Sequence, residues 1–262
     1  MTVAPAPNPD PTLREGRLQL LRRLYAEQLT CRSDEYLQLH GSPSFMRGTE
    51  QVFDWYRRYL PATGKVLDWG CRHAPDACLL SADDDFDLTI YGCDVVEPDR
   101  YKIFHSAAEL QYKVLDHEYA LSYENATFDA VIAAGVLEHV PMEYESLKEL
   151  SRVTKPGGVL VITFLPNSRS LHELRARRST TSRHTPGVAH HLRTYQLKTV
   201  RRALQACGFE VEQIGYQTHF DLLDLEPFAP QHRRLISAVG RHTGAGRVAP
   251  CLALTARRLS YF

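Results

Sequence analysis

Two acidic residues and a glycine have the types and the spacing of a nucleotide site. The apolar run KVLDWG (65–70) contains Asp68 and ends at Gly70, and the later run YGCD ends at Asp94. A glycine turn lets backbone N–H groups approach a ligand, and a carboxylate at the end of the next strand can accept both hydrogen bonds of a ribose diol. The spacing from Asp68 to Asp94 fits two successive strands of an α/β sheet. These residues therefore predict a nucleoside site at the ends of two neighbouring strands.

A second group of candidates leads into a predicted helix at 195–207. It consists of His190, His191 and Tyr195. An imidazole has a pKa near neutrality, so one of these histidines could take a proton from a hydroxyl or an amine. The alternative is a structural histidine that caps the helix or covers a bound ligand.

An arginine-rich segment at 166–193 interrupts the alternation of strands and helices. An insertion at the carboxyl edge of a parallel sheet is a usual place for a substrate lid. Arginine offers bidentate geometry to a carboxylate or a phosphate, so some of these arginines could bind an anionic acceptor: Arg169, Arg175, Arg178 and Arg193. A solvated stretch without a ligand is the alternative. A second irregular insertion is expected at 219–248.

The overall composition excludes several functions. The 262 residues include 31 basic and 31 acidic side chains, whereas a sequence-independent nucleic-acid binder needs a basic surplus. No run of about 18 apolar residues could span a bilayer. The N-terminus lacks the basic and apolar regions of a signal peptide. We therefore expect a cytoplasmic protein that binds neither nucleic acid nor membrane.

Metal and disulfide chemistry are also disfavoured. The six cysteines are scattered and form no CxxC pair, so reduced thiols are expected. Glu138 and His139 could contribute to a metal site, but no further Asp or Glu follows at once. His139 could equally hold its loop by hydrogen bonds. We predict no metal.

The chain divides into three parts. Residues 1–11 are Pro-rich and are predicted to be a disordered tail. Residues 12–60 form a helical cap, whose second helix is predicted to begin with Thr49 as its N-cap. Residues 61–262 form an α/β domain whose apolar runs lack alternation, as in a parallel sheet covered on both faces. The predicted strands are 65–69, 89–94, 112–116, 128–134, 158–164, 209–217 and 251–258, and the helices are 74–81, 98–109, 142–154 and 195–207.

Five motifs in order resemble the class I S-adenosylmethionine-dependent methyltransferases, in their small-molecule, type 11-like branch. They are VLDWGC, the acid Asp94, FDAVIAAGVLEHV, LKELSRVTKPGGVLVIT and HLRTYQLKTVRRALQACGFEV. The resemblance implies a Rossmann-like α/β fold: a seven-stranded, mostly parallel sheet with one antiparallel strand, helices on both faces and an N-terminal helical cap. It also implies S-adenosyl-L-methionine as the cofactor.

The resemblance assigns residues to the parts of that cofactor. Beside the methionine portion and the sulfonium it places Asp68, Gly70, Cys71, Ala134 and Gly135. Around the ribose and the adenine it places Asp94, Val95 and either Asp116 or His117. The HLRTY pattern favours His191 over His190 as a base. Cap residues often cover the substrate pocket in this branch, which makes candidates of Tyr36, His40, Phe45 and Arg47.

The first motif departs from the family pattern. Members usually continue with Gly-x-Gly after Gly70-Cys71, whereas this chain has Arg72, His73 and Ala74. The side chain of Arg72 must avoid the cofactor, so the turn has shifted or directs Arg72 outward. Ala74 is a mild replacement if its φ is negative. A catalytically degenerate module that binds the cofactor or a partner is therefore the alternative function.

The expected activity is direct SN2 methylation of a small molecule. The acceptor atom is expected to be a hydroxyl of a secondary metabolite, a sugar or a lipid precursor, and an anionic acceptor is compatible with the arginines. AAGVLEH stands where nucleobase N-methylating enzymes have an NPPY-like tetrapeptide, which disfavours that activity. An NAD-dependent oxidoreductase is disfavoured because no GxGxxG follows the first strand.

Overall fold

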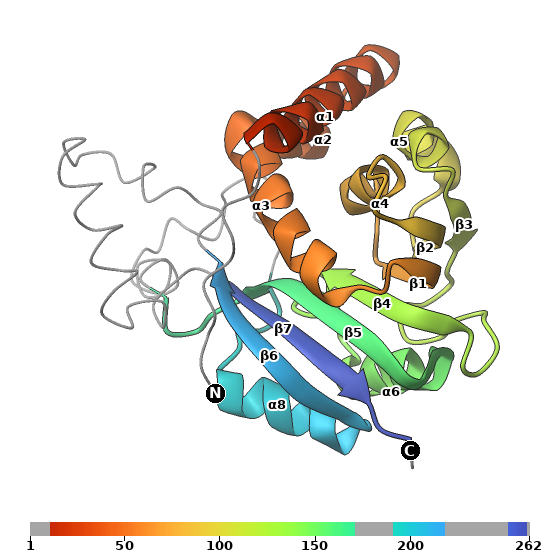
Figure 1. Cartoon of the computed structure of the whole chain (residues 1–262), viewed down its shortest axis with the longest axis vertical. Coiled ribbons are helices and arrows are strands. Elements are labelled where there is room, and N and C mark those ends of the chain that lie inside the picture. The colour runs from red at the N-terminus through yellow and green to blue at the C-terminus, as the bar shows by residue number, and fades with distance from the viewer. Residues whose placement is uncertain (1–10, 171–190, 218–250, 261–262) are drawn as a thin grey trace.

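The computed structural model describes residues 11–170, 191–217 and 251–260 (Figure 1). The predicted disordered tail lies outside these residues except for Pro11, which begins the first helix. Most of the predicted lid-like insertion at 166–193 and all of the insertion at 219–248 also lie outside the described residues.

A seven-stranded sheet forms the centre of the α/β domain. Its strands are β1 (Thr63–Trp69), β2 (Asp87–Asp94), β3 (Gln111–Val114), β4 (Phe128–Ala134), β5 (Thr154–Pro166), β6 (Phe209–Gln217) and β7 (Cys251–Arg258). They lie in the order β3-β2-β1-β4-β5-β7-β6. The pairs from β3 to β5 are parallel, and β7 is antiparallel to β5 and to β6. The prediction of a mostly parallel sheet with one antiparallel strand is confirmed.

The strand order reverses between β1 and β4. From β1 the chain proceeds outward to β2 and β3, and it then returns to the other side of β1 to build β4 and β5. Connections that leave β1 and β4 must diverge from this point to reach opposite sides, which opens a crevice at the carboxyl ends of the strands. The topology therefore places a ligand site at these ends.

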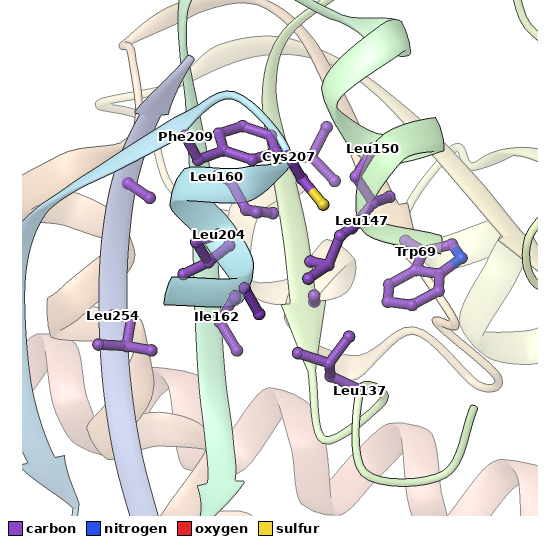
Figure 2. Packing of buried hydrophobic residues seen from close by; sticks show 14 of the residues in the cluster. Trp69, Leu137, Leu147, Leu150, Leu160, Ile162, Leu204, Cys207, Phe209 and Leu254 are labelled. Carbon is purple, nitrogen blue, oxygen red and sulfur yellow. The ribbon is translucent and has the colours of Figure 1, made fainter. Parts of the chain in front are cut away.

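Helices cover both faces of the sheet, as predicted. On one face, α6 (Glu143–Val153) and α8 (Leu197–Ala206) pack on the strands, and Figure 2 shows Leu147 and Leu204 in that core with Trp69. On the other face lie α4 (Pro75–Ser81), the 3-10 turn η1 (Pro98–Tyr101), α5 (Lys102–Ala107) and the cap helices. Both faces of the central parallel strands, β4 and the later part of β5, are thus buried, which explains their continuous apolar sequences.

The cap contains three helices rather than two. They are α1 (Pro11–Cys31), α2 (Glu35–His40) and α3 (Pro43–Tyr59). The prediction that Thr49 caps the second helix was wrong, because Pro43 after Ser42 starts that helix earlier and Thr49 donates to the carbonyl of Phe45 inside it. Helix α2 was missed because six residues carry too little periodicity, although Asp34 caps it by accepting the N–H of Leu37 at 2.7 Å.

A buried ion-pair cluster holds the cap together. Glu50 of α3 is fully buried and pairs with Arg14 and Arg17 of α1 at 2.6 and 2.7 Å. A buried carboxylate needs such partners to offset its desolvation. Within the described ranges, the structure contains no helix long and apolar enough to cross a membrane.

Candidate active site

Two connections meet at the carboxyl edge of the sheet. One is the β1 turn (residues 70–74), which joins β1 to α4, and the other is the β4 loop (residues 135–141), which follows β4. They are in contact, because a Cβ atom on Gly70 would lie 2.6 Å from Cγ1 of Val136. Gly70 itself has a φ of +68°, which favours glycine. The predicted site residues on the first and fourth strands are therefore brought together.

The β1 turn keeps a left-handed backbone without the expected glycines. Arg72 has a φ of +45° and Ala74 a φ of +54°. Ala74 therefore does not have the negative φ that would have made it a mild replacement. Left-handed conformations cost non-glycine residues on the order of 1–3 kcal/mol each, and they persist only where the surroundings enforce them.

The surroundings of the turn are side chains of the cap and of β2. The N–H of Arg72 donates to Oδ2 of Asp94 at 2.9 Å, and its guanidinium lies 4.1 Å from the ring centroid of Tyr36 in α2. The hydroxyl of Tyr25 in α1 is hydrogen-bonded to Nε2 of the buried His73 at 2.6 Å. The side chain of Arg72 is thus directed toward the cap, and the backbone of the turn is hydrogen-bonded to Asp94.

Three of the predicted cap residues form a row of rings that ends on Arg72. The ring centroids of Tyr36 and His40 are 3.9 Å apart, and those of His40 and Phe45 are 4.7 Å apart. Burial lowers the pKa of His40 to about 4, so this imidazole is neutral at physiological pH. A substrate contact by these residues or by Arg47 stays a prediction.

Asp68 and Asp76 form a pair of buried carboxylic acids beside the turn. They are 3% and 4% exposed. Burial raises the pKa of Asp68 well above its usual value, and the charges of Asp76 and Asp94 raise it further. Burial also raises the pKa of Asp76 to about 7, against the lowering effect of a hydrogen bond with Tyr56. In the part of the chain that the structure describes, Oδ1 of Asp76 has no hydrogen-bond partner.

Sequence reasoning missed Asp76. Only the position of Asp76 could have identified it from the sequence, because it lies in the first turn of the helix that follows the glycine turn. An acid there is ordinarily read as a helix-stabilising residue that complements the helix dipole. Only the fold shows that Asp76 lies close enough to Asp68 for its charge to raise the pKa of Asp68.

Asp94 and Val95 at the end of β2 differ in burial. Asp94 is 8% exposed, and burial raises its pKa although the N–H groups of Arg72 and Val95 and the guanidinium of Arg72 oppose this. Val95 follows it at the edge and is 56% exposed. A hydrogen-bond acceptor and an open apolar surface are therefore adjacent.

The remaining candidates at this end are divided between core and surface. Cys71 is buried and its thiol packs beside Gly92, so it can offer a ligand only its backbone. Asp116 and His117 follow β3 and are exposed, with the His117 ring stacked on Tyr119 at 5.1 Å. The structure does not choose between Asp116 and His117.

The β4 loop carries a buried acid beside Gly135. Gly135 follows Ala134 with a φ of +65°, and a Cβ atom there would lie 3.6 Å from Oε1 of Glu138. Glu138 is 2% exposed, and burial raises its pKa to about 8. Its Oε1 lies 3.8 Å from Nε2 of His139. The loop therefore brings a carboxyl and an imidazole to the same edge as the β1 turn.

The residues from 191 to 195 are hydrogen-bonded to this loop. The N–H of Leu192 donates to the carbonyl of Glu138 at 2.9 Å, and Arg193 donates to the carbonyl of Val140 at 2.7 Å. The buried hydroxyl of Tyr195 donates to the carbonyl of Leu137 at 3.0 Å.

These contacts indicate different roles for the predicted catalytic residues. The proton of the Tyr195 hydroxyl is engaged and burial raises its pKa, both of which favour a structural role. His191 is exposed, and its ring centroid lies 5.1 Å from that of His139. His190 lies outside the described residues. Arg193 holds the loop, which occupies it with backbone carbonyls rather than leaving it to an acceptor.

An open hollow of about 500 Å³ lies at the end of β5 against α8. Its cationic lining consists of Arg169, Lys198, Arg201 and Arg202. Of the predicted anion-binding residues, Arg169 is here, whereas Arg175 and Arg178 lie outside the described residues.

Comparison with known proteins assigns this arrangement to a family. A family profile described as a methyltransferase domain matches residues 44–214, well over half of the chain. The chain belongs to the class I S-adenosylmethionine-dependent methyltransferases. Its cofactor is S-adenosylmethionine.

Individual relatives of this methyltransferase match only in part. The 2-methyl-6-phytyl-1,4-hydroquinone methyltransferase of Synechocystis sp. is 33% identical over 109 residues, which are 39% of this chain and 32% of the relative. The 27-O-demethylrifamycin SV methyltransferase of Amycolatopsis mediterranei is 27% identical over 169 residues, 60% of this chain and 58% of the relative. The matches thus span less than two thirds of either relative.

A solved structure matches over nearly the whole length. The crystal structure of the cyclase SpnF has a TM-score of 0.58 and 19% sequence identity, and the match covers 98% of this chain and 98% of that one. At this identity the likeness shows the shared fold alone.

Proposed function

We propose that the chain transfers a methyl group from S-adenosylmethionine to a hydroxyl of a small molecule. The observation that carries this proposal is the buried pair Asp68 and Asp76 at the sheet edge where Asp94 ends β2. Burial raises the pKa of both carboxyls, and no ion pair with a described residue compensates them. A cationic ligand would supply the missing charge. S-adenosylmethionine carries an amino group and a sulfonium, and it supplies the methyl group of the reaction.

The other cofactor contacts follow from exposure and position. Asp94 would accept hydrogen bonds from the ribose hydroxyls, and the exposed Val95 would pack on the adenine. Asp116 or His117 would meet the adenine amine. The residues without side chains, Gly70 and Gly135, would leave room for the ligand where the β1 turn meets the β4 loop, and Cys71 would contact it through its backbone.

The acceptor is proposed to approach over the β4 loop. One relative is named for a hydroquinone and the other for a 27-O-demethylated rifamycin, and the second name supports a hydroxyl as the acceptor group. The work of the protein is then to align the acceptor oxygen with the methyl group and to manage its proton. His191 is the exposed candidate for that proton. The cationic hollow near Arg169 supports an anionic group on the acceptor.

A second candidate function is a module that binds the cofactor without methyl transfer. The left-handed Arg72 and Ala74 favour it, since both replace the glycine pattern of the family. The structural likeness to SpnF, which is described as a cyclase, shows that this fold also occurs in a protein with another named activity.

Calorimetry and mass spectrometry separate these functions. We expect isothermal titration to show binding of S-adenosylmethionine and of S-adenosylhomocysteine, and a panel of hydroxylated acceptors to include one whose mass rises by one methylene. Binding without turnover across phenolic, sugar and lipid-precursor acceptors would favour the second function. A chain that binds neither nucleoside would overturn both.

A further inference from the structure

Glu138, His139 and His191 bring three potential metal ligands together at the β4 loop. One carboxylate oxygen and one imidazole nitrogen from each histidine all lie within 4.8 Å of one another. Two of the residues are adjacent in sequence, and the third comes from the end of the arginine-rich insertion. This third ligand explains why the sequence predicted no metal here. That prediction looked for a further acid near Glu138, and the additional donor is a distant histidine.

The carboxyl of Glu138 is the reason to expect a ligand. It is 2% exposed, and its Oε2 has no hydrogen-bond partner among the described residues. A buried acceptor oxygen without a partner is costly, and such atoms in native structures mark strain, a missing water or a missing ion. This oxygen belongs to an enclosed carboxyl whose other oxygen, Oε1, lies 3.8 Å from Nε2 of His139.

The backbone holds the third ligand in place without help from an ion. Leu192, next to His191, donates its N–H to the carbonyl of Glu138, so the main chains of the two segments are joined beside the ligand atoms. Tyr195 adds the hydrogen bond to the carbonyl of Leu137. The ligands are thus supplied by two segments whose relative position is already fixed, which reduces the entropy lost when a cation binds.

We propose that Glu138, His139 and His191 bind a divalent transition-metal cation of the zinc type. One carboxylate and two imidazoles are a donor set that zinc and its neighbours accept, and three protein ligands leave a coordination position open for water or an acceptor oxygen. Ligand atoms on one zinc ion lie about 3.3 Å apart, compared with 3.8 Å between Glu138 and His139 here. The nitrogen of His191 lies within 4.8 Å of the other two ligand atoms, so the three ligands must draw closer when they bind an ion.

The position of this cluster suits a cation that acts on the acceptor. Oε1 of Glu138 lies 3.6 Å from where a Cβ atom on Gly135 would be, at the end of the site proposed for the acceptor. A cation there would orient an acceptor hydroxyl and favour loss of its proton. This use rests on the proposed function, whereas binding of the cation does not.

A cobalt titration tests the site directly. Co²⁺ is added to the metal-free full chain, and visible absorption reports its coordination while Zn²⁺ is used as the competitor. We expect a saturable spectrum of low-coordinate cobalt that Zn²⁺ displaces. His191→Ala, an exposed substitution, and Glu138→Gln, which keeps the side-chain shape, should each weaken cobalt binding by more than about 10–100-fold, the cost of losing an outer-shell partner alone. His117→Ala removes an exposed histidine elsewhere and should bind cobalt as the wild type does.

The outcomes are distinct. No cobalt spectrum in the wild type, or a spectrum that both His191→Ala and Glu138→Gln leave unchanged, would overturn the proposal. So would a His191→Ala variant that loses methyl transfer with unchanged cobalt affinity, since His191 would then act as a base. A chain that binds cobalt but neither nucleoside keeps the cation site and overturns the proposed function.

Discussion

The β1 turn and the β4 loop both border buried acids, but they are held in different ways. The β1 turn is fixed by side chains from separate elements, through Asp94 of β2, Tyr36 of α2 and Tyr25 of α1. The β4 loop is held through its backbone carbonyls by the one segment from 191 to 195. The proposed cofactor side therefore depends on the cap, whereas the proposed acceptor side depends on the end of the arginine-rich insertion. Changes on the two sides should affect different measurements.

Gly70→Ala should have the largest effect. A Cβ atom there combines a positive φ with an approach of 2.6 Å to Val136, so it should disturb the contact between the two regions. We expect a loss of about 2–4 kcal/mol in the free energy of unfolding, from backbone strain plus overpacking, together with loss of cofactor binding. Urea denaturation and calorimetry measure these. Gly157→Ala is the matched control, because Gly157 has a φ of +77° with nothing within 4 Å of a Cβ atom. Equal losses of stability in both variants would show that the positive φ alone, and not the approach to Val136, destabilises the protein.

Asp94→Asn should weaken cofactor binding on the β1 side only. The amide keeps one oxygen for the N–H of Arg72 but loses the charge-assisted acceptor for the ribose. The dissociation constant of S-adenosylhomocysteine should rise by the equivalent of about 1–3 kcal/mol, with little change in melting temperature. Asp87→Asn, at the exposed opposite end of β2, should leave the affinity unchanged. An unaltered constant in Asp94→Asn would remove the ribose assignment.

The Asp68 and Asp76 pair should make the unliganded chain less stable as pH rises. A carboxyl with a folded pKa of about 7 and an unfolded pKa near 3.9 retains its proton longer in the native state, so the free energy of unfolding falls between about pH 4 and 7. The slope is at most about 1.4 kcal/mol per pH unit for one group. A cationic cofactor favours the ionised form of the carboxyl, so the affinity for the cofactor should increase from pH 5 to 7. Asp76→Asn should flatten both trends, and an unchanged slope of cofactor affinity would contradict the proposed charge pairing.

The sequence predicted the sheet well because the evidence for it is local. Each buried strand is a short apolar run, so all seven strands were placed and their ends differ by a few residues. The cap was predicted less well, since Pro43 and Asp34 had to be recognised as helix starts against weak periodicity.

Candidate residues can be named from the sequence where one residue type at one strand end suffices, as with Asp68 and Asp94, and their roles stay predictions. They cannot be named where the chemistry depends on tertiary proximity. Asp76 becomes unusual only because the fold brings its charge near Asp68, and His191 comes near Glu138 because its segment is hydrogen-bonded to the β4 loop. Neither pairing leaves a pattern in the order of residues.

Tyr195→Phe should affect the β4 loop moderately. It removes one buried hydrogen bond, to the carbonyl of Leu137, and should cost about 0.5–1.5 kcal/mol in the free energy of unfolding. Cofactor affinity should stay unchanged, because the β1 turn does not depend on this contact. Thermal denaturation and calorimetry measure the two effects. A variant that keeps full stability but loses turnover would return Tyr195 to the catalytic residues.

Arg72→Gly should have the smallest effect and distinguishes most sharply between transfer and mere binding. Glycine relieves the left-handed strain but loses the stacking of the guanidinium on Tyr36, worth about 0.5–1 kcal/mol when exposed. These changes oppose each other, so the free energy of unfolding should change by less than about 1 kcal/mol. If the cap holds the arginine outside the cofactor site, the dissociation constant should also change by less than about fivefold. Tyr36→Leu removes the ring that holds the arginine and serves as the paired variant. A tenfold tighter constant in Arg72→Gly would mean that the arginine obstructs the cofactor, which would favour a degenerate module over a methyltransferase.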